Sequence, residues 1–96
     1  MIASFGDEAT EALFHGTDRR RTRRIPADIR AVALRKLDML NAAAHLMDLR
    51  SPPGNRLETL KGDRKGMHSS RVNDQWRIVF RWVNSDAHDV SIVDYH

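Results

Sequence analysis

The hydrophobic pattern of this 96-residue chain changes once, near residues 52–54, and this change limits the fold more than any other feature. Before these residues, Pro-Pro-Gly, apolar side chains recur every three or four positions, which is the spacing of one helical face. After them, apolar and polar residues alternate, which is the spacing of a half-buried strand. Helices followed by strands with short connections predict an α+β fold, with two N-terminal helices packed on one face of a small, mainly antiparallel sheet.

Two helices are expected in the first half. The first has apolar residues at helical spacing over 9–14, with Asp7 as its N-cap and Gly16 at its end. The second begins near Pro26, because proline fits the first turn of a helix. Its apolar face continues at steps of three and four as far as Met47.

Five short strands are expected, one before the helices and four after them. The candidates are residues 2–5, 56–60, 67–73, 76–83 and 90–93. The turns between the last four are short, so these strands are expected to form a meander.

The strand over 76–83 alternates most clearly. Its aromatic and aliphatic face, which includes Trp76 and Phe80, is expected to meet the helices. The opposite face then carries Arg77 and Arg81. A guanidinium on an open sheet face offers a planar fork of donors to a phosphate, although a solvated surface arginine is the simpler alternative.

Basic residues are concentrated between the two expected helices. The chain has 16 Lys and Arg against 13 Asp and Glu, a net charge of +3. Five arginines fall within six positions, which favours an anionic partner such as nucleic acid. The alternatives are a loop that docks an acidic protein surface and a loop that is simply solvated. The five arginines are Arg19, Arg20, Arg21, Arg23 and Arg24.

Several classes of protein are excluded or disfavoured. There is no cysteine, so disulfide scaffolds, cysteine–zinc sites and thiol catalysis are excluded. No histidine pair has metal-ligand spacing and no glycine-rich nucleotide loop occurs, so we expect no metal and no cofactor. No apolar run approaches a membrane span, and the N-terminus lacks a signal-peptide pattern. We expect a single domain over residues 1–96, located in the cytoplasm.

The chain ends in Asp94-Tyr95-His96, three residues that can transfer a proton or donate a hydrogen bond. Histidine titrates near neutral pH and is the best proton-transfer candidate among them. The alternative is an ordinary frayed terminus.

Three segments together carry a resemblance to a known family: residues 55–66 (NRLETLKGDRKG), 74–82 (DQWRIVFRW) and 93–96 (VDYH). In this order they resemble the HigB toxins, members of the RelE/ParE-like superfamily of bacterial type II toxin–antitoxin systems. The likeness covers nearly the whole chain and implies the same α+β fold that the periodicity predicts.

The resemblance also implies an activity and partners. HigB-like toxins are ribosome-dependent endoribonucleases, or mRNA interferases, which cut mRNA in the decoding site of the 70S ribosome and arrest growth. Their neutralising partner is HigA, a helix-turn-helix antitoxin, and the toxin reaches operator DNA only through the complex with it.

Carried over position by position, the resemblance assigns catalytic roles to Lys61, Arg77, Asp94, Tyr95 and His96. One position departs from the pattern. Some members have a histidine where this chain has Glu58, which makes this carboxylate a second candidate base and leaves the base assignment open.

Four further residues are expected to contact substrate or ribosomal RNA. They are Lys65, Arg71, Gln75 and Arg81. Two other readings stay open: a ParE-like inhibitor of DNA gyrase, and a catalytically inactive nucleic-acid- or protein-binding module of the same fold.

Overall fold

The computed structural model describes residues 1–17 and 19–94 of the chain. In chain order its elements are α1 (Glu8–His15), η1 (Ala27–Ile29), α2 (Arg30–Ala42), η2 (Leu46–Arg50), η3 (Pro53–Asn55), β1 (Glu58–Thr59), η4 (Gly62–Arg64), β2 (Met67–Arg71), β3 (Trp76–Val83) and β4 (Asp86–Asp94), where η marks a 3-10 helix. The strands form one antiparallel sheet in the order β1-β2-β3-β4. The α+β class and the antiparallel meander predicted from the sequence are therefore confirmed.

Helix α1 begins and ends at the residues that the sequence indicates. The carboxylate of Asp7 accepts a hydrogen bond from the backbone N–H of Thr10 at 2.8 Å, and Gly16 closes the helix in the left-handed conformation at φ 67°. The hydroxyl of Thr10, which is fully buried, accepts a hydrogen bond from the backbone N–H of Ile92. This bond attaches α1 to β4.

Helix α2 is shorter than predicted, and the expected continuation to Met47 is wrong. The helix ends at Ala42 and the next residue is extended. The backbone N–H groups of Ala44 and His45 are instead bound by the carboxylate of Asp48 at 3.1 and 3.0 Å. A side chain that satisfies these donors locally removes the need for another helical turn.

In the described part of the chain, no helix combines the length and the apolar character needed to cross a membrane.

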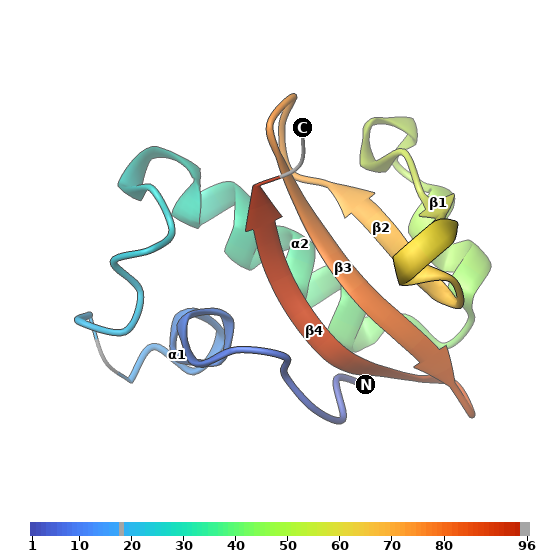
Figure 1. Cartoon of the computed structure of the whole chain (residues 1–96), viewed down its shortest axis with the longest axis horizontal. Coiled ribbons are helices and arrows are strands. Elements are labelled where there is room, and N and C mark those ends of the chain that lie inside the picture. The colour runs from blue at the N-terminus through green and yellow to red at the C-terminus, as the bar shows by residue number, and fades with distance from the viewer. Residues whose placement is uncertain (18, 95–96) are drawn as a thin grey trace.

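The hydrophobic core lies between α2 and one face of the sheet, with α2 behind the strands in Figure 1. Leu37 of α2 and Phe80 of β3 are fully buried, and Ile78 of β3 is 1% exposed. The aromatic and aliphatic face of β3 therefore meets the helical layer, as its alternation predicts.

Strand β4 contains a bulge that the sequence pattern hides. Its pairing with β3 shifts by one residue between Ser91 and His88, where Asp89 has a φ of 54°. The extra residue breaks the alternation. The strand is consequently longer than the predicted segment, 90–93.

The predicted first strand, residues 2–5, is also wrong as a strand. Ile2 and Phe5 form only isolated parallel bridges with β4. The serine between them uses its side chain: Ser4 Oγ accepts a hydrogen bond from the backbone N–H of Asp89 at 2.9 Å. The bulge therefore interrupts what would have been a regular ladder.

The other face of the sheet is not covered by α2. The turn containing η4 lies in front of it (Figure 1). Beneath this turn, Leu60 and Val79 are buried although they belong to this face. We call this surface the open face; its basic residues form the candidate site.

Candidate functional site

Arg77 is the most firmly held cation on the open face. Its side chain is only 14% exposed. One terminal nitrogen, Nη1, donates to the hydroxyl of Ser69 at 3.0 Å and to the backbone carbonyl of Arg56 at 3.4 Å. The other, Nη2, lies 3.5 Å from Oε1 of Glu58. Because several groups fix it, this guanidinium is oriented before any ligand arrives.

The strand register places a second arginine beside the first. Arg71 of β2 is directly opposite Arg77 of β3. Like charges in this arrangement repel one another. Arg71 is paired with the exposed carboxylate of Asp74, as Arg77 is with Glu58. The carboxylate partners of these two adjacent guanidiniums are exposed. An anion such as a phosphate can therefore compete with the carboxylates for the guanidiniums.

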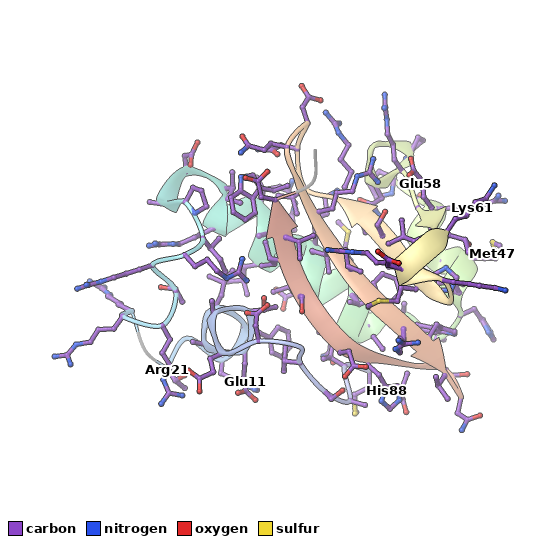
Figure 2. The ribbon with its side chains drawn as sticks, in the orientation of Figure 1. Glu11, Arg21, Met47, Glu58, Lys61 and His88 are labelled. Atoms are coloured by element: carbon purple, nitrogen blue, oxygen red, sulfur yellow. The ribbon has the colours of Figure 1, made fainter. Side chains whose placement is uncertain are left out.

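Glu58 and Lys61 lie at the β1 edge of the sheet (Figure 2). Glu58 is opposite Ser69, the residue that supports Arg77, so the structure brings Glu58 and Arg77 together. Lys61 follows β1 and is exposed, as is Lys65 in the next turn. Lys61 therefore stands at the border of the open face rather than in its centre.

Asp94 lies at the end of β4, opposite Trp76. Cross-strand partners share a face, so Asp94 belongs to the face of Trp76 and not to that of Arg77. Its carboxylate accepts a hydrogen bond of 3.0 Å from the side-chain amide of Gln75. The two remaining members of the C-terminal triplet, Tyr95 and His96, fall outside the described residues.

Arg81 lies further along the open face on β3. Its Nε is 3.4 Å from the carboxylate of Asp89, the bulge residue of β4, and both side chains are about half exposed. The expected substrate-contact residue is thus present on the same face as Arg77, four positions along the strand.

The arginine-rich segment lies on the opposite side of the molecule from Lys61, as the label of Arg21 shows in Figure 2. Its arginines are exposed, while Thr22 and Ile25 anchor the segment in the interior. Arg24 pairs with Asp7 at 3.0 Å. The segment is therefore an attached, basic surface that is separate from the open face.

Three titratable groups have shifted pKa values. Burial, together with the charges of Arg35 and Arg71, lowers the pKa of Lys36. Burial lowers the pKa of His68, whose ring packs against Phe80. For Asp7, burial acts to raise the pKa, but hydrogen bonds from Thr10 and Arg24 outweigh it and leave the pKa lowered. None of these three groups lies among the predicted site residues. Among residues 1–17 and 19–94, no three acidic or histidine side chains form a cluster able to hold a metal ion.

The sequence pattern did not reveal the residues that support Arg77. Ser69 is fully buried on the open face, and only its register opposite Val79 of β3 shows that it lies on the same face as Arg77. Asn55 is also buried; its amide donates to the carbonyls of Leu49 and Ser51. Asn55 thereby fixes the turn whose next residue, Arg56, offers its carbonyl to Arg77. The signal available in the sequence was a polar residue in a short polar stretch; the burial of these residues is seen in the structure.

An α+β chain of this size with a basic open sheet face has the features of the RelE-like toxins. Residues 3–96 match the family model of HigB-like toxins, described as RelE-like toxins of the type II toxin–antitoxin system HigB. The chain belongs to this family, as its motifs indicated.

Two relatives illustrate the match. The chain is 45% identical over 87 residues to Toxin HigB-1 of Vibrio cholerae, which covers 91% of this chain and 90% of that protein. It is 31% identical over 102 residues to a protein of Proteus vulgaris named Endoribonuclease HigB, over the full length of both.

Proposed function

We propose that the protein is a ribosome-dependent endoribonuclease that cleaves mRNA and so inhibits translation. The observation that carries this proposal is the orientation of Arg77, a nearly buried guanidinium held by Ser69 within a basic, open sheet face. A preoriented cation at a surface accessible to a polyanion is suited to stabilising charge that develops on a phosphate. Family membership and the name of the Proteus vulgaris relative support the same activity.

The reaction uses a nucleophile that RNA carries itself. The ribose 2′-oxygen attacks the neighbouring phosphorus, the bond from phosphorus to the 5′-oxygen breaks, and a 2′,3′-cyclic phosphate and a 5′-hydroxyl result. A base on the protein takes the proton of the 2′-hydroxyl and an acid gives a proton to the leaving oxygen. Arg77 and Lys61 neutralise the charge that accumulates on the phosphate oxygens in between.

Proton transfer is assigned to His96, because imidazole titrates near neutral pH. Glu58 is the second candidate base; its position 3.5 Å from Arg77 puts a carboxylate next to the phosphate-binding cation. Asp94 is proposed to orient His96, and Tyr95 to stack on a base or donate a hydrogen bond.

Four residues are proposed to hold the RNA on either side of the scissile phosphate. Arg71 and Arg81 lie on the open face on both sides of Val79, Lys65 is exposed in the turn that follows η4, and Gln75 immediately precedes β3. The basic side chains meet the phosphate backbone, which supplies most of the affinity in such interfaces.

The ribosome supplies what a shallow face lacks. In-line attack requires a fixed geometry, and orientation of this kind is worth several kcal/mol. An open sheet does not enclose a flexible strand, so we propose that the decoding site holds the mRNA bent for attack. The protein would then act in the cytoplasm, where mRNA is translated.

The neutralising partner is proposed to be a HigA-like helix-turn-helix antitoxin, and the complex of the two to bind operator DNA. Membership in a type II toxin–antitoxin family implies an antitoxin. The exposed arginines of residues 19–24 are a candidate contact for it or for ribosomal RNA.

The test is induction of the protein in cells, followed by mapping of mRNA 5′ ends. We expect in-frame cuts at translated codons. Arg77→Ala should slow this cleavage by about 10²–10³, and His96→Ala by about 10²–10⁴. Intact mRNA with stalled replication would select the gyrase inhibitor instead. Normal growth and intact mRNA would favour the inactive binding module. This alternative stays open because Glu58 pairs with Arg77.

A further inference from the structure

We propose that the open face binds a second nucleotide of the RNA, next to the one at Arg77, in a groove between η4 and β4. In this subsite the base lies on an apolar floor, and its phosphate is bound by Arg64 and Arg81. The proposal rests on RNA being the substrate, and it adds to the proposed function a subsite that holds a base.

The groove is a property of the folded chain. Its volume is about 390 Å³, within the range of small-molecule sites, which begins at about 300 Å³. It is therefore large enough for one nucleotide and too small for a folded partner. Its lining comes from the N-terminal segment, η4 and its following strand, β3 and β4: Gly6, Arg64, Met67, Val79, Arg81, Asp89, Ser91 and Val93.

The floor of the groove is apolar. Val79 is 1% exposed although α2 is on the other face of the sheet. Met67 and Val93, which also line the groove, are partly exposed. A thioether and valine methyl groups give a nucleobase a dry surface to lie on, and a neighbouring guanidinium can cover its other face.

Two cations stand at the groove, and they differ in how they are held. Nε of Arg81 is engaged by Asp89 at 3.4 Å, which orients the guanidinium with Nη1 toward Gly66. Arg64 has no ion pair or side-chain hydrogen bond with any other residue in the described ranges 1–17 and 19–94. A phosphate between them would give Arg64 a partner and use the remaining donors of Arg81.

The strand register fixes this groove relative to Arg77. Arg77 faces Val93, and the next residue on the same face, Val79, faces Ser91. The groove therefore begins immediately beside Arg77. Its far cation, Arg81, is four residues along β3, about 13 Å at the rise of a strand. Arg81 thus serves a neighbouring nucleotide and not the phosphate bound at Arg77.

The test is a titration of the full chain with adenosine 5′-monophosphate, followed by NMR at the methyl groups of Met67, Val79 and Val93. We expect these three signals to shift, and Arg64→Gln and Arg81→Gln each to weaken binding about fivefold or more. The matched control is Arg35→Gln, which removes a charge from α2 on the far side of the sheet and should change the affinity less than about twofold. Inorganic phosphate is the second ligand, and should bind more weakly than the nucleotide.

Two results would overturn the subsite: no shift at these methyl groups, or equal affinity for inorganic phosphate and the nucleotide, which would leave only an anion site. The variant Arg77→Ala separates this proposal from the nuclease proposal. We expect Arg77→Ala to stop mRNA cleavage and still to bind the nucleotide in the groove. Cleavage by the wild type without nucleotide binding would refute the subsite alone, and nucleotide binding without cleavage would refute the nuclease alone.

Discussion

The guanidinium of Arg77 donates a hydrogen bond of 3.0 Å from Nη1 to the hydroxyl of Ser69, and this serine is wholly buried on the open face of the sheet. Ser69 of β2 is in register with Val79 of β3, which is two residues along the strand from Arg77. The bond therefore joins two adjacent strands. Ser69 therefore acts as a positioning residue: it has no contact with solvent itself, yet it sets the direction of the cation that does.

Substitution Ser69→Ala should lower the rate of mRNA cleavage on programmed ribosomes about tenfold, because the guanidinium loses a buried acceptor and reorients. We expect the free energy of unfolding to fall by about 1–2 kcal/mol. The matched control is Ser70→Ala, since Ser70 is the next residue, similarly buried, and faces the core opposite Ile78. Equal losses of activity in the two variants would assign Ser69 a merely structural role.

Replacement of the two candidate bases should give unequal losses. Glu58 is engaged by Arg77, and its side chain is 51% exposed. We therefore expect Glu58→Gln to reduce single-turnover cleavage by less than about tenfold, and His96→Ala by about 10²–10⁴, the usual contribution of a proton-transfer group. The control for the lost charge is Glu11→Gln on the exposed side of α1. If Glu58→Gln proves the more damaging change, the base is the carboxylate.

The sequence predicted the face of each β3 residue because one strand in a half-buried sheet alternates strictly. Trp76, Ile78 and Phe80 meet the core, and Arg77 and Arg81 lie opposite them. This alternation was sufficient to locate the basic face, because the side-chain period of a strand is fixed by its backbone.

The features that the sequence did not predict depend on side chains that bind backbone. Asp48 binds the N–H groups beyond Ala42 and so ends α2 early, and Ser4 binds the backbone at the Asp89 bulge. Ser69 contributes to the site through a cross-strand contact. Periodicity describes which residues are apolar, but it does not say which backbone group or strand a short polar side chain will reach.

Substitution Asn55→Ala should destabilise the fold by about 2–4 kcal/mol. Asn55 is 1% exposed, and its amide donates to two carbonyls at 3.2 and 3.4 Å. Its oxygen accepts a hydrogen bond from Lys36, whose pKa is lowered by burial and by nearby arginines. The substitution leaves these groups without partners, which costs more than the bonds themselves contribute.

Urea unfolding checks the expectation for Asn55, with Asn41→Ala as the control. Asn41 is exposed and accepts a single bond, from the backbone N–H of Ile2, so its loss should cost less than about 1 kcal/mol. A similar midpoint for the two variants would contradict the role of Asn55 as the centre of the turn before β1.

The stability of the fold should fall in acid through Asp7. The pKa of this carboxyl is lowered in the folded protein, so the folded state binds the proton less readily than the unfolded chain. Its contribution is therefore present above the ordinary pKa of about 3.8 and is lost as the pH falls through the folded value.

Asp7→Asn tests this contribution, because asparagine remains a good N-cap but carries no charge. We expect the variant to unfold more easily than the wild type at pH 7, and the difference to shrink as the pH falls below the ordinary pKa of about 3.8. Thermal unfolding at a series of pH values measures it. A constant difference across the series would mean that Asp7 acts through its shape and not through its charge.

Charge reversal in the loop before η1 should weaken one of the two proposed partners. The exposed Arg20, Arg21 and Arg23 are the residues to change, while Arg24 is left intact because its ion pair with Asp7 holds the loop to α1. With all three replaced by glutamate, we expect association with the antitoxin or with the ribosome to slow about tenfold or more at low salt. The effect should shrink as salt screens the charges.

The control is the same triple change to lysine, which keeps the charge and removes the planar fork of donors. The loop lies on the opposite side of the molecule from Lys61, so a variant that no longer binds the antitoxin should still cut mRNA at the wild-type rate. A variant that binds the antitoxin normally but no longer engages the ribosome would identify the loop as a contact for ribosomal RNA. Unchanged affinity for both partners would show that the arginines serve only to solvate the loop, because a docking charge cannot be reversed without an electrostatic cost.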